Sequence, residues 1–515
     1  MAKSGAAGAR APRTVSGVVG VGCLLAGLTL VLVSGSSVSA ASSGGRTPAV
    51  SGPVTGGTGV SLLGPDVSSL GYVREEYFID GVAANYQPVG KLASGGKWTV
   101  KATNKAPFKT RIVVWKPADP ADFNGTVFVE WLNVSPGFDN PPDWLNAHNQ
   151  IVREGAAWVG VSAQAASVKG GDVIQAAGAP PPGGLKAADP ERYGTLDHPG
   201  DAFSYDVFTQ AGRAVRGDGK GAKPFEGYDV KRVIAVGESQ SGFRMTTYVN
   251  AIHPLAKVYD GFLIHSRGGQ AAPFGDQRLG QAIPDIPQGV KIRGDLDVPV
   301  LTVETETDLV NPRLGFTPAR QPDSKRFRLW EVAGTAHADA YLGGGPSLSD
   351  LGDGSAEVVL LDPKQGSGGR LGCAAPINAG AQYAVISAAL TQIERWVHTG
   401  SPPPKAPRIE TTSSGGVTAI VRDDHGIARG GVRTPIVDAP IATNDGEENS
   451  GPSFCLLFGH MKPFDAATLA ALYPNGRDDY VAAFDKAVDK AVKAGIWLKP
   501  EGEHYMVAAR QITFG

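Results

Sequence analysis

Apolar runs of strand length alternate with helix-like segments from Tyr72 onward, and this alternation limits the possible fold more than any other feature. The runs at 125–134, 156–164 and 231–239 are almost continuously apolar, as strands buried on both faces of a sheet are. Strands that alternate with helices are typical of a parallel sheet with crossover helices. The sequence therefore predicts a large α/β domain.

The composition indicates a folded chain with no strong electrostatic partner. Of its 515 residues, 42% are apolar and 19% are charged, which allows a sizeable core and argues against global disorder. The formal net charge is -2 and no block is rich in Lys and Arg. A nucleic-acid partner is therefore not expected.

The first forty residues have the features of a secretory signal peptide. Lys3, Arg10 and Arg13 give a positive start, an apolar stretch follows at 18–33, and a small-x-small tripeptide ends at Ala40. An uncleaved membrane anchor is the alternative, but the apolar stretch is short and contains glycines. We expect cleavage after Ala40, which gives a secreted or cell-envelope protein without a stable membrane span.

Three cysteines occur in the chain, and Cys23 lies in the predicted signal peptide. The remaining pair, Cys373 and Cys455, predicts one disulfide, since an even number of cysteines in an exported chain favours a bridge. Two buried free thiols are the alternative. The histidines are too scattered to indicate a metal site.

A proline-rich break at 401–407 divides the later part of the chain. Beyond it, Val481, Phe484, Val488 and Val492 recur at helical spacing, which predicts a helix packed on the main domain. The predicted parts are a signal peptide at 1–40, a flexible lead-in at 41–70, the main domain at 71–400 and a C-terminal extension at 401–515.

The stretch GESQSGF at 237–243 places a serine between an apolar strand and a helix. A nucleophile on such a tight turn needs small residues two positions before and after it, because the two backbones nearly touch. Ser239 meets this condition with Gly237 and Ser241, whereas a nucleophile at Ser241 would have Phe243 two positions on. Ser239 is the candidate nucleophile, and an ordinary loop hydroxyl is the alternative, since such pentapeptides also arise by chance.

The start of the helix after Ser239 is suited to a developing oxyanion, because free N–H groups and the helix dipole meet there. The backbone N–H of Gln240 is the first expected donor. The second is expected from the loop after the strand that ends near Trp131, with Asn133 favoured and its neighbours Leu132 and Val134 also possible.

A serine nucleophile needs a base, and the base needs an orienting acid. His337 follows the strand-like run at 326–332 in a loop lined by Gly and Ala, and is the expected base. Glu304 and Glu306 alternate with Asp308 at the end of the preceding strand-like run, 298–307. Asp308 is favoured as the acid because it lies just past the strand end, and Glu306 remains open as the alternative acid.

With these motifs, the chain resembles the α/β-hydrolase superfamily, and more closely a group of large bacterial proteins described as alpha/beta hydrolase domain-containing. The stretches FNGTVFVEWLNVSPG, GESQSGFRMTTYVNAIHP and WEVAGTAHADAY carry the resemblance, which extends from about Tyr72 to the C-terminus. It implies a mostly parallel central sheet with helices on both faces, N-terminal strands and a mixed C-terminal extension. It also implies Ser239 as nucleophile and His337 as base, in the chain order serine, acid, histidine.

The sequence thus predicts a secreted serine hydrolase that acts on carboxylic esters, either small molecules or polymers. No metal or organic cofactor is implied. Two alternatives stay open: an acyltransferase acting on envelope lipids or sugars, and a non-catalytic binding protein on a hydrolase scaffold. The acyl and alcohol parts of the substrate and the oligomeric state are not predicted.

Overall fold

A ten-stranded sheet forms the centre of the part of the chain that the computed structural model describes, namely residues 47–171, 183–276, 285–362, 371–452 and 454–514. The predicted signal peptide, Cys23 and the cleavage site after Ala40 lie outside the described residues, as does most of the proline-rich loop at 177–184. The described residues belong to one unit, which begins at Gly45.

The sheet has the order β10-β9-β8-β7-β4-β5-β3-β2-β1-β6, and its first six strands run parallel to one another. The parallel strands are β4 (Thr126–Trp131), β5 (Ala157–Val161), β7 (Arg232–Glu238), β8 (Gly261–His265), β9 (Val300–Thr305) and β10 (Phe327–Val332). The other strands are β1 (Ala49–Ser51), β2 (Tyr72–Pro88), β3 (Val100–Pro117) and β6 (Lys220–Gly221); β3 pairs antiparallel with β5 and with β2. The predicted fold class is confirmed.

The parallel strands are apolar on both sides because helices cover both faces of the sheet. Every residue of β4, β5, β8, β9 and β10 is buried. Successive side chains of a strand point to opposite faces. In β8, accordingly, Leu263 joins one buried cluster while Phe262 and Ile264 join the other. A parallel arrangement also brings the carboxyl ends of β4, β7, β9 and β10 to one edge of the sheet.

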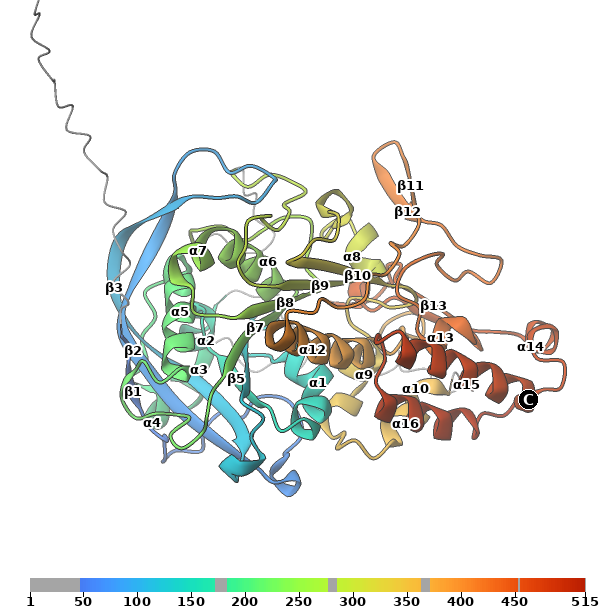
Figure 1. The fold of residues 1–515 in the computed structure, drawn as a ribbon, viewed down its shortest axis with the longest axis horizontal. Helices are drawn as coiled ribbons and strands as arrows, with labels where there is room; N and C mark the ends of the chain where they lie inside the picture. Colours follow the sequence, from blue (N-terminus) through green and yellow to red (C-terminus); the bar gives the residue numbers. More distant parts are fainter. Residues whose placement is uncertain (1–46, 172–182, 277–284, 363–370, 453, 515) are drawn as a thin grey trace, which may run out of the picture. The chain divides into compact units, whose positions relative to one another are not determined.

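One face is covered by α1 (Pro142–Arg153) and α12 (Gln382–Thr399), and the other by α5 (Ser204–Val215) and α6 (Gln240–Thr247), as Figure 1 shows. None of the helices in the described ranges is long and apolar enough to cross a bilayer. The shorter helices are α2 (Ala165–Lys169), α3 (Gly184–Ala188), α4 (Pro190–Tyr193), α7 (His253–Ala256), α8 (Glu306–Val310), α9 (Ala340–Gly344) and α10 (Ser355–Leu361).

Residues 47–70, part of the predicted flexible lead-in, are folded against the sheet. β1 pairs antiparallel with β2, and the N–H of Val54 donates to Glu76 O at 2.7 Å. Val50 and Val67 are buried. A composition rich in Ser, Gly and Pro suggested flexibility, but the edge of β2 offers unpaired backbone groups that this segment satisfies. The expectation of flexibility therefore fails for this segment.

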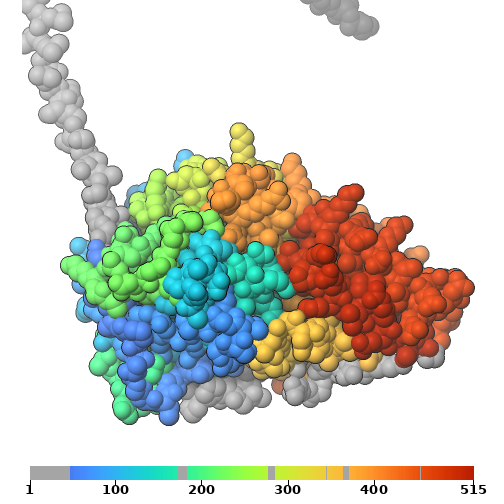
Figure 2. Space-filling model, turned by 60° about the horizontal axis from the view of Figure 1, so that its bottom comes forward, coloured from blue at the N-terminus to red at the C-terminus, as the bar shows by residue number. Residues whose placement is uncertain are grey.

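The C-terminal extension contributes side chains to the same buried cluster as α12. Phe484 and Val488 of α15 (Arg477–Lys493) are buried there together with Trp396 of α12. The helix α16 (Lys499–Ala509) packs on α10 and α15, and Figure 2 shows the red C-terminal segment directly beside the yellow segment that contains α10. The extension also contains β11 (Thr411–Ser414), β12 (Val417–Ile420), α13 (Pro435–Asp438), β13 (Ala442–Asp445), β14 (His460–Pro463) and α14 (Ala466–Leu472).

A disulfide joins the extension to the main domain. Cys373 and Cys455 are bridged with an S–S distance of 2.11 Å and are 82 residues apart in sequence. The bridge links the segment before α12 to the loop before β14, so two distant parts of the chain are held together covalently.

Replacing Phe484 with alanine tests how much the extension contributes to stability. Phe484 is fully buried, so we expect Phe484→Ala to lower the free energy of unfolding by about 3–5 kcal/mol. Val507→Ala on α16 is the control, because Val507 is 50% exposed and its loss should change stability by only about 0.5 kcal/mol. Denaturant unfolding measures both. Equal stability of the two variants would show that the extension does not share the core.

Candidate active site

Ser239 occupies a strained turn between β7 and α6. Its φ of 53° and ψ of -117° lie in a region that non-glycine residues rarely adopt, at a cost of about 1–3 kcal/mol. The turn is fixed by two backbone hydrogen bonds: Ser239 N–H donates to His265 O at 3.0 Å, and Phe243 N–H donates to Ser239 O at 3.0 Å. The side chain is left partly exposed at the carboxyl edge of the sheet.

The small residues around Ser239 are required by this turn. A Cβ built on Gly237 would lie 3.3 Å from the Cβ and the backbone of Ser241, which is tighter than an ordinary contact. Gly237 and Ser241 therefore allow β7 and α6 to meet closely. This is the local reason why the sequence places a serine, and not a larger residue, two positions after Ser239.

His337 lies between Ser239 and Asp308. Its Nε2 is 2.9 Å from Ser239 Oγ, and its Nδ1 is 2.6 Å from Asp308 Oδ1. A carboxylate only accepts, so Nδ1 carries the hydrogen and Nε2 is free to accept from the serine hydroxyl. Burial disfavours the charged imidazole, but the nearby carboxylates Asp308 and Glu238 outweigh it and raise the pKa of His337.

Asp308 is itself fixed by the start of α8. Thr305, the residue before α8, donates to Asp308 Oδ2 from its N–H at 2.7 Å and from its hydroxyl at 2.8 Å. The first of these bonds and the return bond, from Asp308 N–H to the Thr305 hydroxyl oxygen at 3.4 Å, form a capping box, which sets the orientation of the carboxylate. The other oxygen, Oδ1, faces His337, so the acid presents one oxygen to the helix start and one to the imidazole.

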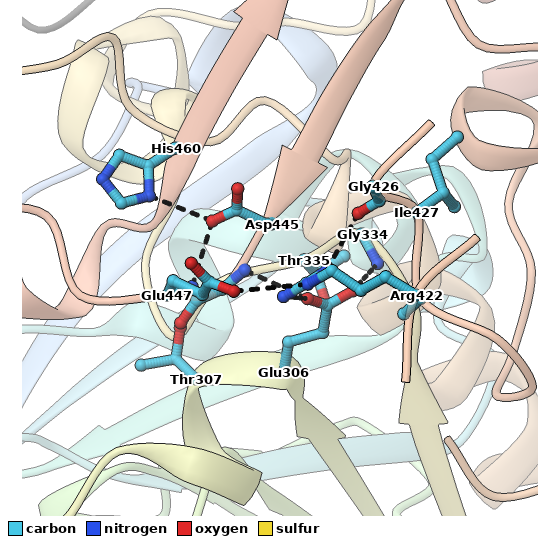
Figure 3. A network of polar contacts seen from close by, with 12 residues as sticks. Glu306, Thr307, Gly334, Thr335, Arg422, Gly426, Ile427, Asp445, Glu447 and His460 are labelled. Atoms are coloured by element: carbon cyan, nitrogen blue, oxygen red, sulfur yellow. Dashed lines mark hydrogen bonds and ion pairs between the residues drawn. The ribbon is translucent and has the colours of Figure 1, made fainter. Parts of the chain in front are cut away.

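Glu306, the alternative acid, does not contact His337 but anchors two loops. Its carboxylate accepts from Gly334 N–H at 2.6 Å and from Gly446 N–H at 3.1 Å, and it pairs with Arg422 at 2.9 Å (Figure 3). Burial raises the pKa of Glu306, while Arg422 and the two N–H groups act in the opposite direction. Gly334 lies at the start of the loop that carries His337, so Glu306 stabilises the position of this loop without contacting the imidazole.

The partners of Glu306 come from the C-terminal extension. Arg422 also contacts Glu447 at 3.3 Å and donates to Gly426 O at 3.1 Å (Figure 3). Nearby, Asp445 pairs with His460 at 3.0 Å. In addition, Ala338 N–H, next to His337, donates to Leu457 O at 3.1 Å. The extension therefore holds the loop of His337 at several points.

The two expected oxyanion donors differ in availability. Gln240 is the first residue of α6, where helix N–H groups have no partner within the helix. The prediction for Asn133 is wrong in this structure, because Asn133 N–H donates to Asn140 O at 2.9 Å and Asn140 N–H donates back. The loop 133–140 is closed by this pair. The next N–H, that of Val134, has no acceptor among the described residues.

Sequence reasoning missed Glu238, the residue before Ser239. Its Oε1 lies 3.3 Å from His337 Nε2. Burial is the largest influence on this carboxyl and, together with nearby carboxylates, raises the pKa of Glu238 to about 7, although His337 and His265 oppose the rise. A signal was present in the sequence, because a strand buried on both faces rarely ends in an unpaired acid.

The described residues contain no cluster of three or more His, Cys, Asp or Glu that could hold a metal ion. At this edge of the sheet the structure brings together a hydroxyl, an imidazole and a carboxylate, next to the start of α6. Such a set is suited to covalent catalysis by a serine.

The comparison with protein families identifies the class of this protein. The model described as "Alpha/beta hydrolase domain" matches residues 47–507, so the chain belongs to this family. The resemblance found in the sequence is thereby confirmed. A search of curated proteins finds no match.

Solved structures similar to this chain are distant ones. They include a candidate dienelactone hydrolase from Klebsiella pneumoniae, with 13% identity, TM-score 0.25 and coverage of 49% of this chain and 85% of that one. An α/β serine hydrolase without a lid from Xanthomonas campestris has 11% identity, TM-score 0.25 and coverage of 56% and 87%. A cold-adapted esterase from an Arctic intertidal metagenomic library has 11% identity, TM-score 0.26 and coverage of 50% and 84%.

Replacing Arg422 tests the anchoring role of Glu306. Arg422→Met leaves a fully buried carboxylate without its cation, so we expect a loss of about 3 kcal/mol in the free energy of unfolding. The double variant Glu306→Gln/Arg422→Met removes both charges and should recover part of that loss. Denaturant unfolding of the three proteins measures this. A single variant as stable as the wild type would mean that the pair does not anchor the loops.

Proposed function

We propose that this protein is a serine hydrolase that cleaves carboxylic esters through an acyl-enzyme intermediate. The chief support is the pair of contacts made by His337, 2.9 Å to Ser239 Oγ and 2.6 Å to Asp308 Oδ1. Membership of the α/β-hydrolase family is consistent with this reaction class.

In the proposed reaction, Ser239 Oγ attacks the acyl carbon of the ester while its proton passes to His337 Nε2. Asp308 keeps the imidazole in the tautomer that can accept this proton and stabilises the imidazolium that forms. The proton then moves to the oxygen of the departing alcohol as the C–O bond breaks. Water, activated by the same imidazole, afterwards releases the acid from Ser239.

The tetrahedral oxyanion would be held by two backbone N–H groups. Gln240 offers one from the start of α6, where the helix dipole adds to its effect. Val134 takes the place expected for Asn133, because its N–H lies in the same loop and is not used within the described residues. Preorganised donors of this kind are worth about 3–4 kcal/mol each in acyl transfer.

Asp308 is the better candidate for the acid, because Glu306 has other partners. The two oxygens of Glu306 are taken by Gly334, Gly446 and Arg422, and breaking these contacts would expose a buried charge. Asp308 meets His337 without giving up its bonds to Thr305.

We also propose that the protein is exported, on the basis of the charged start, apolar stretch and cleavage tripeptide in its first forty residues. Acyl transfer to an alcohol would use the same groups as hydrolysis. Product analysis with an added alcohol separates the two reactions, since hydrolysis yields the free acid and transfer yields a new ester.

Ser239→Ala tests the nucleophile. We expect the hydrolysis of short-chain nitrophenyl esters to fall by about 10⁴-fold or more, because the covalent step is lost. Ser241→Ala is the matched control, since it lies in the same motif and its side chain has no hydrogen-bond partner among the described residues. Equal activity of Ser239→Ala and the wild type, with both folded, would rule out this nucleophile.

Paired substitutions test the acid. Asp308→Asn should lower turnover by about 10⁴-fold, because an amide in that position favours the wrong imidazole tautomer. Glu306→Gln should have a smaller effect, through a shift of the loop that carries His337. Steady-state kinetics measures the turnover of both variants, and circular dichroism checks that both are folded. A larger loss of turnover in folded Glu306→Gln would reverse the assignment.

A further inference from the structure

The carboxylate of Glu238 has two contacts within the candidate site. Glu238 is the last residue of β7 and is 5% exposed. Its Oε1 lies 3.3 Å from His337 Nε2, the same nitrogen that faces Ser239 Oγ at 2.9 Å. Its Oε2 accepts from Asn133 Nδ2 at 3.0 Å. Glu238 thus touches both the imidazole and the loop after β4.

The first contact places His337 between two carboxylates. Asp308 lies at Nδ1 and Glu238 lies at Nε2. A neutral imidazole presents a lone pair at Nε2, which an ionised carboxylate repels weakly. A protonated imidazole presents an N–H and a full positive charge at the same point, and a carboxylate attracts both. An ionised Glu238 therefore favours the protonated state of His337 over the neutral state.

The second contact reaches the loop that carries the Val134 N–H. Asn133 uses its Nδ2 for Glu238 and its Oδ1 for the N–H of Ser135 at 2.8 Å. The same Nδ2 also approaches the backbone O of Glu238 at 3.3 Å. Both ends of the Asn133 side-chain amide are thereby hydrogen-bonded. Val134 lies between Asn133 and Ser135, which the second of these bonds joins.

Other charged and titratable groups surround Glu238. His265 at the end of β8 lowers the pKa of Glu238, as His337 does, while Asp143 of α1 and Asp308 of α8 raise it. His265 is itself held by Asp143, with Nδ1 3.3 Å from Oδ1, and by Gln382 of α12 at 2.7 Å. The Glu238 carboxylate thus lies among two histidines and two other carboxylates, which act on its pKa in opposite directions.

We propose that Glu238 is a positioning residue of this site, which stabilises His337 while it holds the serine proton and which fixes the oxyanion loop through Asn133. The proposal rests on the proposed function, in which the proton leaves Ser239 Oγ for His337 Nε2 as the Oγ–C bond forms. Glu238 takes no proton from the substrate and forms no covalent bond. Glu238 lowers the free energy of the imidazolium form of His337 and, through Asn133, fixes the position of the Val134 N–H.

A pH dependence follows from this arrangement. The base works only when His337 is neutral, so activity falls on the acid side with the pKa of His337. The Glu238 carboxylate raises that pKa. Removing its charge should therefore move the acid limb of kcat/KM to lower pH while reducing the maximum rate, because the imidazolium formed during reaction loses a partner.

Glu238→Gln provides the test, since it removes the charge and keeps an oxygen that can accept from Asn133. We expect the midpoint of the acid limb to fall by up to about 1 pH unit, the lower end of what a neighbouring opposite charge causes, because the raised pKa of Glu238, about 7, leaves it only partly ionised over this limb. The titration of His337, followed by NMR of protein labelled in histidine and assigned with His337→Asn, should shift by the same amount. Glu238→Asp keeps the charge and should leave the midpoint closer to the wild type.

A matched control separates electrostatics from folding. Glu357 on α10 is a buried carboxylate that accepts from the Tyr383 hydroxyl at 2.7 Å, and Glu357→Gln should leave both midpoints unchanged. If Glu238→Gln lowers activity but leaves the NMR midpoint of His337 unchanged, the inference is wrong. The NMR arm needs no turnover, so it still decides this point if Ser239→Ala shows that the proposed function fails.

Discussion

The contact between His337 Nε2 and Ser239 Oγ is the interaction on which the proposed chemistry depends. It joins two loops that are 98 residues apart in the chain. At 2.9 Å it is a hydrogen bond, so a small displacement of either loop would break it. Each side is held by the sheet: Ser239 by the strained turn after β7, and His337 by the loop after β10. The parallel register brings these two strand ends to the same edge.

The C-terminal extension helps to position His337 for its contact with Ser239. Glu306 draws Gly334, Gly446 and Arg422 together, and Leu457 O accepts from the residue after His337. Glu306 is buried, so its contacts with Gly334, Gly446 and Arg422 stabilise a charge that would otherwise be costly. The disulfide of Cys455 holds the same part of the extension. The position of the imidazole thus depends on residues far beyond the sheet.

The fold could be predicted from the sequence because its causes are local and repeated. Buried parallel strands require continuous apolar runs, and the turn at Ser239 requires small residues on both sides, and both patterns can be read in the chain. The choice between Glu306 and Asp308 could not be read. Both lie in the first turn of α8, where residues two apart point in nearly opposite directions, and only the start of the helix decides which one faces His337.

The predictions for Asn133 and the lead-in failed, and Glu238 was missed, because contacts with distant parts of the chain decide what these residues do. Asn133 has the expected position in the chain, but the pairing of its backbone with Asn140 closes the loop and uses its N–H, which no local pattern reveals. The lead-in has a flexible composition, yet the open edge of β2 orders it. An acid at the end of a buried strand was a signal for Glu238, but its contact with His337, which follows another strand, could not be read from the sequence.

The most direct measurement of the central claim is covalent trapping of the nucleophile. A fluorophosphonate reacts with a serine only when an adjacent base activates it, and the adduct can be located by peptide mass spectrometry. We expect one adduct, on Ser239, and we expect the Asp308→Asn variant to form it far more slowly. An adduct on another serine, or none at all in the folded protein, would contradict the claim.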